Sequence, residues 1–191
     1  DPDFMAWQFD AQRNPLMTDK DAISSLTIWD GNELVGMQGL IYTDFVIEKK
    51  IIPGVWLCNL MAAEEYKAKG VGLMLMMAVH DLDVNVIATA GINPALYPFY
   101  QKMRYQTLDS IPRFVKVIDP ESFTELAPEY KGDIPLCDEP ENRSEILSDF
   151  DADWDMFFDT LIAQGYSGVY KNADFMRWRY AHHPEFIYET I

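Results

Sequence analysis

A glycine loop that leads into an apolar segment is the first part of the sequence with the residues for chemistry. Lys67-Ala68-Lys69-Gly70-Val71-Gly72 runs directly into Leu73–Leu82, which is rich in Leu and Met. This pattern predicts a loop that opens a buried helix. The first-turn amides of a helix lack partners within it, and the helix dipole favours negative charge there. The loop therefore indicates an anion site, and tight packing of a helix on a strand is the alternative interpretation.

Other common motifs for nucleotides, metals or nucleophiles are missing from the sequence. No Lys-Ser/Thr pair follows the glycines, and the three spaced glycines of a dinucleotide fingerprint are absent. Cys58 and Cys137 form no CxxC motif, and the His182-His183 pair has no further ligands at a metal-binding spacing. We expect no metal site, and we expect Cys58 to be a core residue rather than a nucleophile, since its neighbours are apolar.

The charge of the chain bears on its partners and on its domain organisation. The net charge is −16, which repels phosphate backbones, so we expect no nucleic-acid partner. No apolar run is long enough for a membrane span and no signal peptide is visible, so a cytoplasmic location is expected. Residues 1–118 hold 14 acidic and 10 basic residues, whereas residues 119–191 hold 17 and 5. This shift predicts a domain at 1–118, an acidic proline-containing linker at 119–150 and a helical segment at 151–191.

The elements that must position the glycine loop can be read from hydrophobic patterns and turn residues. Strands are expected at Ala22–Trp29, Glu33–Ile47 and Ile51–Ala62, with turns at Asp30-Gly31 and Lys49-Lys50. Further along the chain, short strands are expected at Val84–Ala90 and Arg113–Ile118. Helices are expected from the Asn93-Pro94 start to about Met103, at Asp151–Gln164 and at Asp174–His182.

This order of elements, together with two motifs, resembles the GCN5-related N-acetyltransferase superfamily. The loop Lys67–Gly72 resembles the family's pyrophosphate loop, Arg/Gln-x-x-Gly-x-Gly/Ala. Asn93, Phe99, Tyr100 and Tyr105 fit its later Asn-x-x-Ala-x-x-Phe-Tyr-x-x-x-Gly-Phe pattern, over a resemblance that covers about residues 22–118. The resemblance implies an α/β (α+β) fold of the acyl-CoA N-acyltransferase type. Its sheet would be mixed and mostly antiparallel, with flanking helices and, in this chain, an acidic helical C-terminal segment.

The same resemblance implies acetyl transfer from acetyl-CoA, as co-substrate, to a small amine or amino sugar. Tyr100 would be the catalytic proton donor to the leaving thiolate. Backbone groups near the end of the third strand would bind the pantetheine arm, the loop would bind the pyrophosphate, and Asn93 would be a helix cap and a cofactor contact. The implied cofactor-binding residues are Leu60, Met61, Ala62, Lys67, Ala68, Lys69, Gly70, Val71, Gly72 and Asn93.

Two questions stay open at this point. The sequence does not identify the general base. The candidates on or just after the third strand are Cys58, Asn59, Glu64 and Glu65. Tyr100 is alternatively a core aromatic residue beside Phe99. The rival function is accordingly a non-catalytic module of the same fold that binds CoA or a protein partner.

An internal repeat is also visible. Asp3-Phe4-Met5-Ala6-Trp7-Gln8-Phe9 matches Asp174-Phe175-Met176-Arg177-Trp178-Arg179-Tyr180, with Asp, Phe, Met and Trp identical. The match predicts a duplicated domain in which 151–191 starts a second copy, and chance similarity of two aromatic helices is the alternative. The first domain would then be incomplete at its N-terminus. A strand at Phe186–Ile191 is expected to pair with the first sheet or with another molecule, which would form a homodimer.

Overall fold

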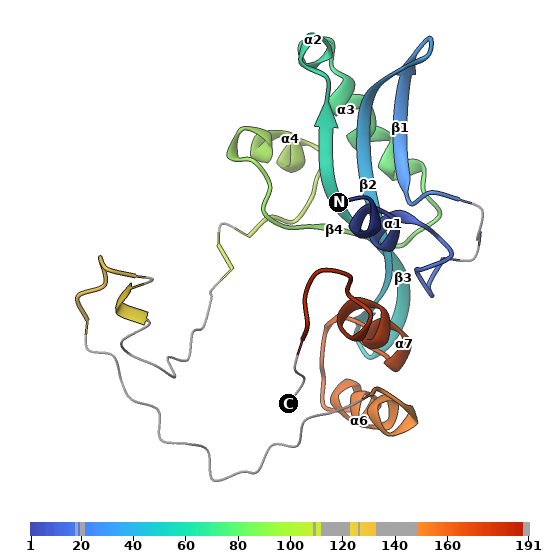
Figure 1. Ribbon diagram of the computed structural model, residues 1–191, viewed down its shortest axis with the longest axis vertical. Coiled ribbons are helices and arrows are strands. Elements are labelled where there is room, and N and C mark those ends of the chain that lie inside the picture. The colour runs from blue at the N-terminus through green and yellow to red at the C-terminus, as the bar shows by residue number, and fades with distance from the viewer. Residues whose placement is uncertain are drawn as a thin grey trace. The chain divides into compact units, whose positions relative to one another are not determined.

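The computed structural model describes residues 1–17, 19, 22–108, 110–111, 123–125, 127–132 and 149–188 (Figure 1). Two compact units are present. One comprises residues 1–92 together with 146–191, and the other comprises residues 93–145. The predicted closing strand Arg113–Ile118 lies outside the described residues. Most of the predicted linker lies outside them as well, so the predicted division at residues 118 and 150 stays a prediction.

The first unit is built on one sheet with the strand order β1-β2-β3-β4. The pairs β1–β2 and β2–β3 are antiparallel, β4 runs parallel to β3, and the short β5 pairs with β2. The predicted fold class, a mixed and mostly antiparallel sheet with flanking helices, is confirmed. The strands are β1 (Ser25–Asp30), β2 (Glu33–Ile47), β3 (Lys50–Ala62), β4 (Val86–Thr89) and β5 (Gly168–Val169).

Two tight turns set the register of the antiparallel strands. Gly31 has a φ of 59° in the turn between β1 and β2, and because Asp30 pairs with Glu33 this turn is Gly31-Asn32, one residue later than the predicted Asp30-Gly31. In the second turn, Glu48 and Lys49 both have positive φ, 51° and 64°. Hairpin turns of this hand require positive φ at both central residues, a conformation that neither side chain favours. The turn therefore lies one residue earlier than the predicted Lys49-Lys50.

Helices approach the sheet closely at two glycines of β2. A Cβ atom at Gly36 would lie 2.4 Å from Val71 Cγ1, in α3 (Val71–Ala78). A Cβ atom at Gly39 would lie 2.7 Å from the Phe9 ring, in α1 (Pro2–Phe9). Because residues three apart in a strand point to opposite faces, α3 and α1 cover opposite faces of the sheet. The sheet is thus covered on both sides.

Of the remaining helices of the first unit, α2 (Glu64–Lys67) was not predicted, and the others lie in or close to predicted helical segments. The helix α6 (Ala152–Ala163) begins at the Asp151 cap, and α7 (Ala173–Met176) continues as the π-helical η3 (Arg177–Ala181). The short helix α2 precedes α3, and the 3₁₀-helix η1 (Val79–Asp81) follows it. In the second unit, the 3₁₀-helix η2 (Pro94–Leu96) leads into α4 (Tyr97–Lys102), within the helix predicted to start at Asn93-Pro94. The predicted strand at Phe186–Ile191 is wrong for residues 186–188, which have no strand structure, and residues 189–191 lie outside the described part.

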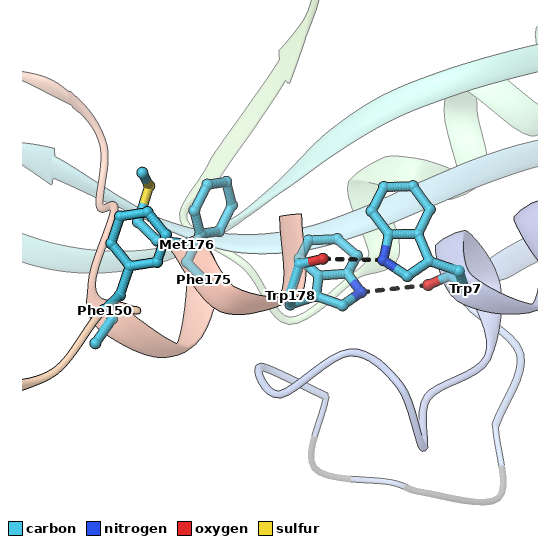
Figure 2. Packing of buried hydrophobic residues seen from close by; sticks show 6 residues of the cluster. Trp7, Phe150, Phe175, Met176 and Trp178 are labelled. Carbon is cyan, nitrogen blue, oxygen red and sulfur yellow. Dashed lines mark hydrogen bonds between the residues drawn. The ribbon is translucent and has the colours of Figure 1, made fainter. Parts of the chain in front are cut away.

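The two repeated segments contact each other through their tryptophans (Figure 2). Trp7 Nε1 donates to the Trp178 carbonyl at 2.9 Å, and Trp178 Nε1 donates to the Trp7 carbonyl at 3.3 Å. The rings stack with centroids 5.3 Å apart, and both side chains are 4% exposed. Equivalent residues that exchange equivalent bonds have the pattern of a local two-fold relation. Duplication of the domain stays a prediction.

We predict that Trp7→Phe destabilises the protein by about 1–3 kcal/mol, since the buried Trp178 carbonyl would lose its indole donor. Urea unfolding of the wild type and the variant measures the difference. Trp29→Phe is the matched control, because Trp29 is 57% exposed on β1 and its indole bonds only a neighbouring threonine. Its effect should stay within about 0.5 kcal/mol. Equal destabilisation by the two substitutions would contradict the prediction.

Candidate functional site

The predicted glycine loop opens α3 as expected. Gly70 caps the helix in the left-handed conformation, with φ 81° and ψ 14°, and its carbonyl accepts the first helical bond from the Met74 amide at 3.0 Å. Glycine adopts this conformation without the strain that a side chain would add. The backbone conformation therefore explains the glycine at position 70.

Gly72 has no such structural explanation. It lies in the first turn of α3, and a Cβ atom there, as at Gly70, would meet no heavy atom within 4 Å among the described residues. The glycine that helix packing does require is Gly36, which lies against Val71. Tight helix–strand packing therefore does not account for Gly72. Open space beside first-turn amides is what an anion needs to approach the backbone.

Side chains around the loop carry charges of both signs. Lys67 pairs with Glu64, and both side chains are largely exposed. The Lys69 ammonium lies 3.9 Å from the centre of the Tyr66 ring. The Tyr66 hydroxyl donates to Asp30 Oδ2 at 2.6 Å, and this bond to a carboxylate is the main cause that raises the Tyr66 pKa to about 12. Tyr66 thus ties the loop to the β1–β2 turn, a role that the sequence did not reveal.

The end of β3 departs from the regular ladder. Gly39 pairs with Cys58 and Met37 pairs with Met61, so Asn59 and Leu60 together face Gln38 alone. Asn59 has a φ of 50°. This is a β-bulge, which bends the strand and leaves one residue unpaired. The predicted pantetheine-binding residues Leu60, Met61 and Ala62 begin within the bulge and continue beyond it.

The outer edge of β3 becomes free at the same place. β4 pairs with β3 only over Gly54–Leu57. Within the part of the chain that the structure describes, no strand continues along this edge beyond Leu57. Backbone groups of the last residues of β3 can therefore bond an extended ligand, as an edge strand does.

The strand end and the helix start meet at one residue. Gly36 pairs with Ala62 in the sheet and lies against Val71 of α3. The structure thus brings the predicted strand residues and the predicted loop together. Asn93 and Tyr100 belong to the second unit.

The described contacts of Asn93 and Tyr100 are local. The Asn93 side chain accepts from the Ala95 amide at 2.9 Å, which confirms its role as a helix cap. Tyr100 is 4% exposed, and its ring packs edge-on against Tyr105 with centroids 5.1 Å apart. Burial raises the Tyr100 pKa, so the phenol stays protonated at neutral pH. Its proposed catalytic role stays a prediction.

The Cys58 thiol is not suited to act as a nucleophile or as a base. It is partly buried, and Gln8 Nε2 lies 3.5 Å from its sulfur. Burial raises the Cys58 pKa to about 11, so the thiol stays protonated at neutral pH. Reactive cysteines have lowered pKa values instead. Of the other candidates for the base, Asn59 and Glu65 are exposed and Glu64 is paired with Lys67.

His183 serves a structural purpose. The His183 ring packs on Trp7 with centroids 4.4 Å apart, and its Nδ1 accepts from the Glu185 and Phe186 amides. Among the residues that the structure describes, no cluster of three His, Cys, Asp or Glu side chains is arranged for a metal ion. None of the described helices is long and apolar enough to cross a bilayer.

Comparison with known proteins gives matches to solved structures only. No family model matches the chain, and no curated protein matches it. Among similar solved structures is a GCN5-related N-acetyltransferase from Kribbella flavida, with 21% identity, a TM-score of 0.36, and coverage of 40% of this chain and 20% of that one. An aminoglycoside 6'-N-acetyltransferase from Acinetobacter haemolyticus has 16% identity, a TM-score of 0.36, and coverage of 50% and 70%.

A third similar structure is described as a transcriptional regulator from Bacillus halodurans. It has 14% identity, a TM-score of 0.40, and coverage of 47% of this chain and 63% of that one. Two of these three structures are acetyltransferases. The chain spans less than two thirds of the Kribbella and Bacillus proteins, so its own activity and acceptor are matters for proposal.

We predict that alkylation of Cys58 by iodoacetamide rises about tenfold per pH unit and reaches no plateau below about pH 10, since only the thiolate reacts. The measurement uses a Cys137→Ser variant, so that a single cysteine reports. The same protein unfolded in urea is the control, and its rate should level off near the ordinary thiol pKa. A plateau near pH 8–9 in the folded protein would contradict the raised pKa.

Proposed function

We propose that the chain is an acetyl-CoA-dependent N-acyltransferase that transfers the acetyl group directly to a small amine or amino sugar. The observation that carries the proposal is the meeting of a bulged, open-edged strand end with a glycine-opened helix at Gly36. One feature suits an extended amide-containing arm and the other suits a diphosphate. CoA contains both groups in one molecule.

The residues present fit this co-substrate. The amides of the Lys67–Gly72 loop and of the first turn of α3 would hold the diphosphate, where Gly70 and Gly72 leave open space. Lys67 and Lys69 would add positive charge nearby. The backbone of Leu60, Met61 and Ala62 would bond the pantetheine arm along the free edge of β3. When bound, acetyl-CoA supplies an activated thioester at the end of this arm.

In this proposal the protein's own residues orient the thioester and supply a proton. The β3 edge would hold the arm so that the acceptor nitrogen can attack the thioester carbon. Tyr100 would deliver its hydroxyl proton to the sulfur as the C–S bond breaks, because its raised pKa keeps the phenol protonated. Asn93 would cap its helix and contact the co-substrate. Of the candidates for the base, Cys58 is the least suited, because it is a protonated thiol.

Charge supports an amine acceptor. The net charge of −16 draws cations toward the protein, and amines are cations at neutral pH. The cytoplasmic location expected from the sequence, where acetyl-CoA is available, is part of this proposal. So is a small molecule, rather than a nucleic acid, as the acceptor.

One observation favours the rival function, a non-catalytic module that binds CoA or a protein. Tyr100 is 4% exposed and packs on Tyr105, as a core residue does. If Tyr100 had only a structural role, CoA could still bind, but Tyr100 would not donate a proton in the reaction. Binding and turnover must therefore be measured separately.

We predict that CoA raises the melting temperature of the wild type and that Gly72→Ala weakens CoA binding about tenfold or more, equivalent to 1.4 kcal/mol. The added methyl group would occupy the open space where the diphosphate is proposed to lie. The same substitution should leave folding unchanged or stabilise it by about 0.4–1 kcal/mol, since Gly72 is helical and uncrowded. Calorimetry gives the affinity, and urea unfolding gives the stability.

Met77→Ala is the matched control for this experiment, because Met77 is 59% exposed in the last turn of the same helix. It should leave CoA affinity unchanged. Gly70 is a poorer choice for substitution, since its positive φ would add backbone strain. Equal CoA affinity of the wild type and Gly72→Ala would show that the loop does not bind the diphosphate.

We predict that Tyr100→Phe keeps CoA affinity nearly intact and lowers turnover by ~10²-fold or more, the scale expected for a lost general acid. Release of free thiol from acetyl-CoA, measured against a library of amines, gives the turnover. Tyr105→Phe is the control, because it removes a hydroxyl from the ring that packs on Tyr100. Unchanged turnover in Tyr100→Phe would return Tyr100 to a core role and favour the rival function.

A further inference from the structure

A buried glutamine faces the bulge in β3. Gln38 of β2 lies opposite Asn59 and Leu60, and it is 1% exposed. Its side-chain Nε2 donates to the Cys58 carbonyl at 2.6 Å and to the Gly39 carbonyl at 3.1 Å. Cys58 is the last residue of β3 before the bulge. The glutamine therefore bonds the backbone at the point where the strand leaves the regular ladder.

The orientation of the Gln38 amide follows from its partners. Both nearby groups are carbonyl oxygens, which only accept hydrogen bonds, so the NH₂ group must face them. The Oε1 atom then has no partner among the described residues, although it is buried. An unpaired buried acceptor costs about 1–3 kcal/mol, a cost that an apolar side chain of similar size would avoid. Stability of the core does not explain a glutamine at this position.

We infer that Gln38 is a positioning residue for the co-substrate's arm, acting through the backbone of the bulge. By holding the Cys58 carbonyl, it sets where β3 bends and so aims the backbone of Leu60–Ala62 along the free edge. This inference rests on the proposed function. Gln38 lies outside the two motifs that resemble the acetyltransferase family. Its substitution is expected to affect binding of the pantetheine arm but not binding of the diphosphate.

Gln8 provides a contrast within the same chain. It is also a buried glutamine whose Oε1 has no partner among the described residues, and it also contacts Cys58. Its Nε2, however, lies 3.5 Å from the Cys58 sulfur and makes no described bond to the backbone of the bulge. Loss of the Gln8 amide should therefore leave the path of β3 unchanged.

The test compares two probes that share a diphosphate. CoA carries the pantetheine arm, and ADP lacks it. Gln38→Met should weaken CoA binding about tenfold, one 1.4 kcal/mol step, while ADP binding stays within about twofold. Gln8→Met should change neither affinity. Calorimetry on the full chain gives all the dissociation constants, and a general loss of structure would lower both affinities together.

A second variant tests the hydrogen bond without changing the size of the side chain. Gln38→Glu has no donor when ionised but regains one when protonated. The ratio of CoA to ADP affinity should therefore stay near the wild-type value while the carboxyl is protonated and fall as the pH is raised through its pKa, which burial raises. The wild-type ratio should stay constant over the same range.

Three outcomes would overturn the inference. An unchanged CoA-to-ADP ratio in both Gln38 variants would show that the glutamine does not position the arm. If Gln8→Met changed the CoA-to-ADP affinity ratio equally, the change would result from general disruption of the core and not from loss of the Gln38 bond. If the wild type binds neither CoA nor ADP, both the proposed function and the inference about Gln38 are wrong. If the wild type binds both probes and the Gln38 variants bind them equally well, only the inference about Gln38 is wrong.

Discussion

The arrangement of the site depends on position 36 being a glycine, which has no side chain. A single methyl group there would collide with Val71 at 2.4 Å and move α3 away from the sheet. The same residue pairs with Ala62 at the end of β3. A shift of the helix would therefore separate the open edge of the strand from the amides at the helix start. Close packing in protein interiors makes such a separation costly to absorb elsewhere.

Much of this arrangement could be predicted from local residue patterns. Asp30-Gly31 marks a hairpin turn, Asn93-Pro94 marks a helix start, and the spacing of aromatic residues marks α6. These signals act over a few neighbouring residues, so they appear in the sequence. The glycine loop was also predictable, because a left-handed cap such as Gly70 favours one residue type.

Other features arise only when distant segments meet. No glycine in the sequence marks the bulge at Asn59. The proposed role of Gln38 depends on its hydrogen bond to a carbonyl of the neighbouring strand, which the sequence does not show. The bond between Tyr66 and Asp30 likewise joins a helix to a turn that lies far away in the sequence. The π-helical form of Arg177–Ala181 follows a pattern that reads as an ordinary helix. Tertiary contacts decide such features, and local propensity does not.

The Trp7–Trp178 contact also bears on how the chain folds as it is made. Its two residues are 171 positions apart, so α1 emerges from the ribosome long before its partner. At ordinary rates of synthesis the delay is roughly 10–30 s, far longer than a hairpin needs to form. During this time one face of Trp7 stays uncovered, whereas β1, β2 and β3 can already pair with one another. The packing of α1 is thus completed only after Trp178 has been made, and a nascent chain would expose the Trp7 indole until then.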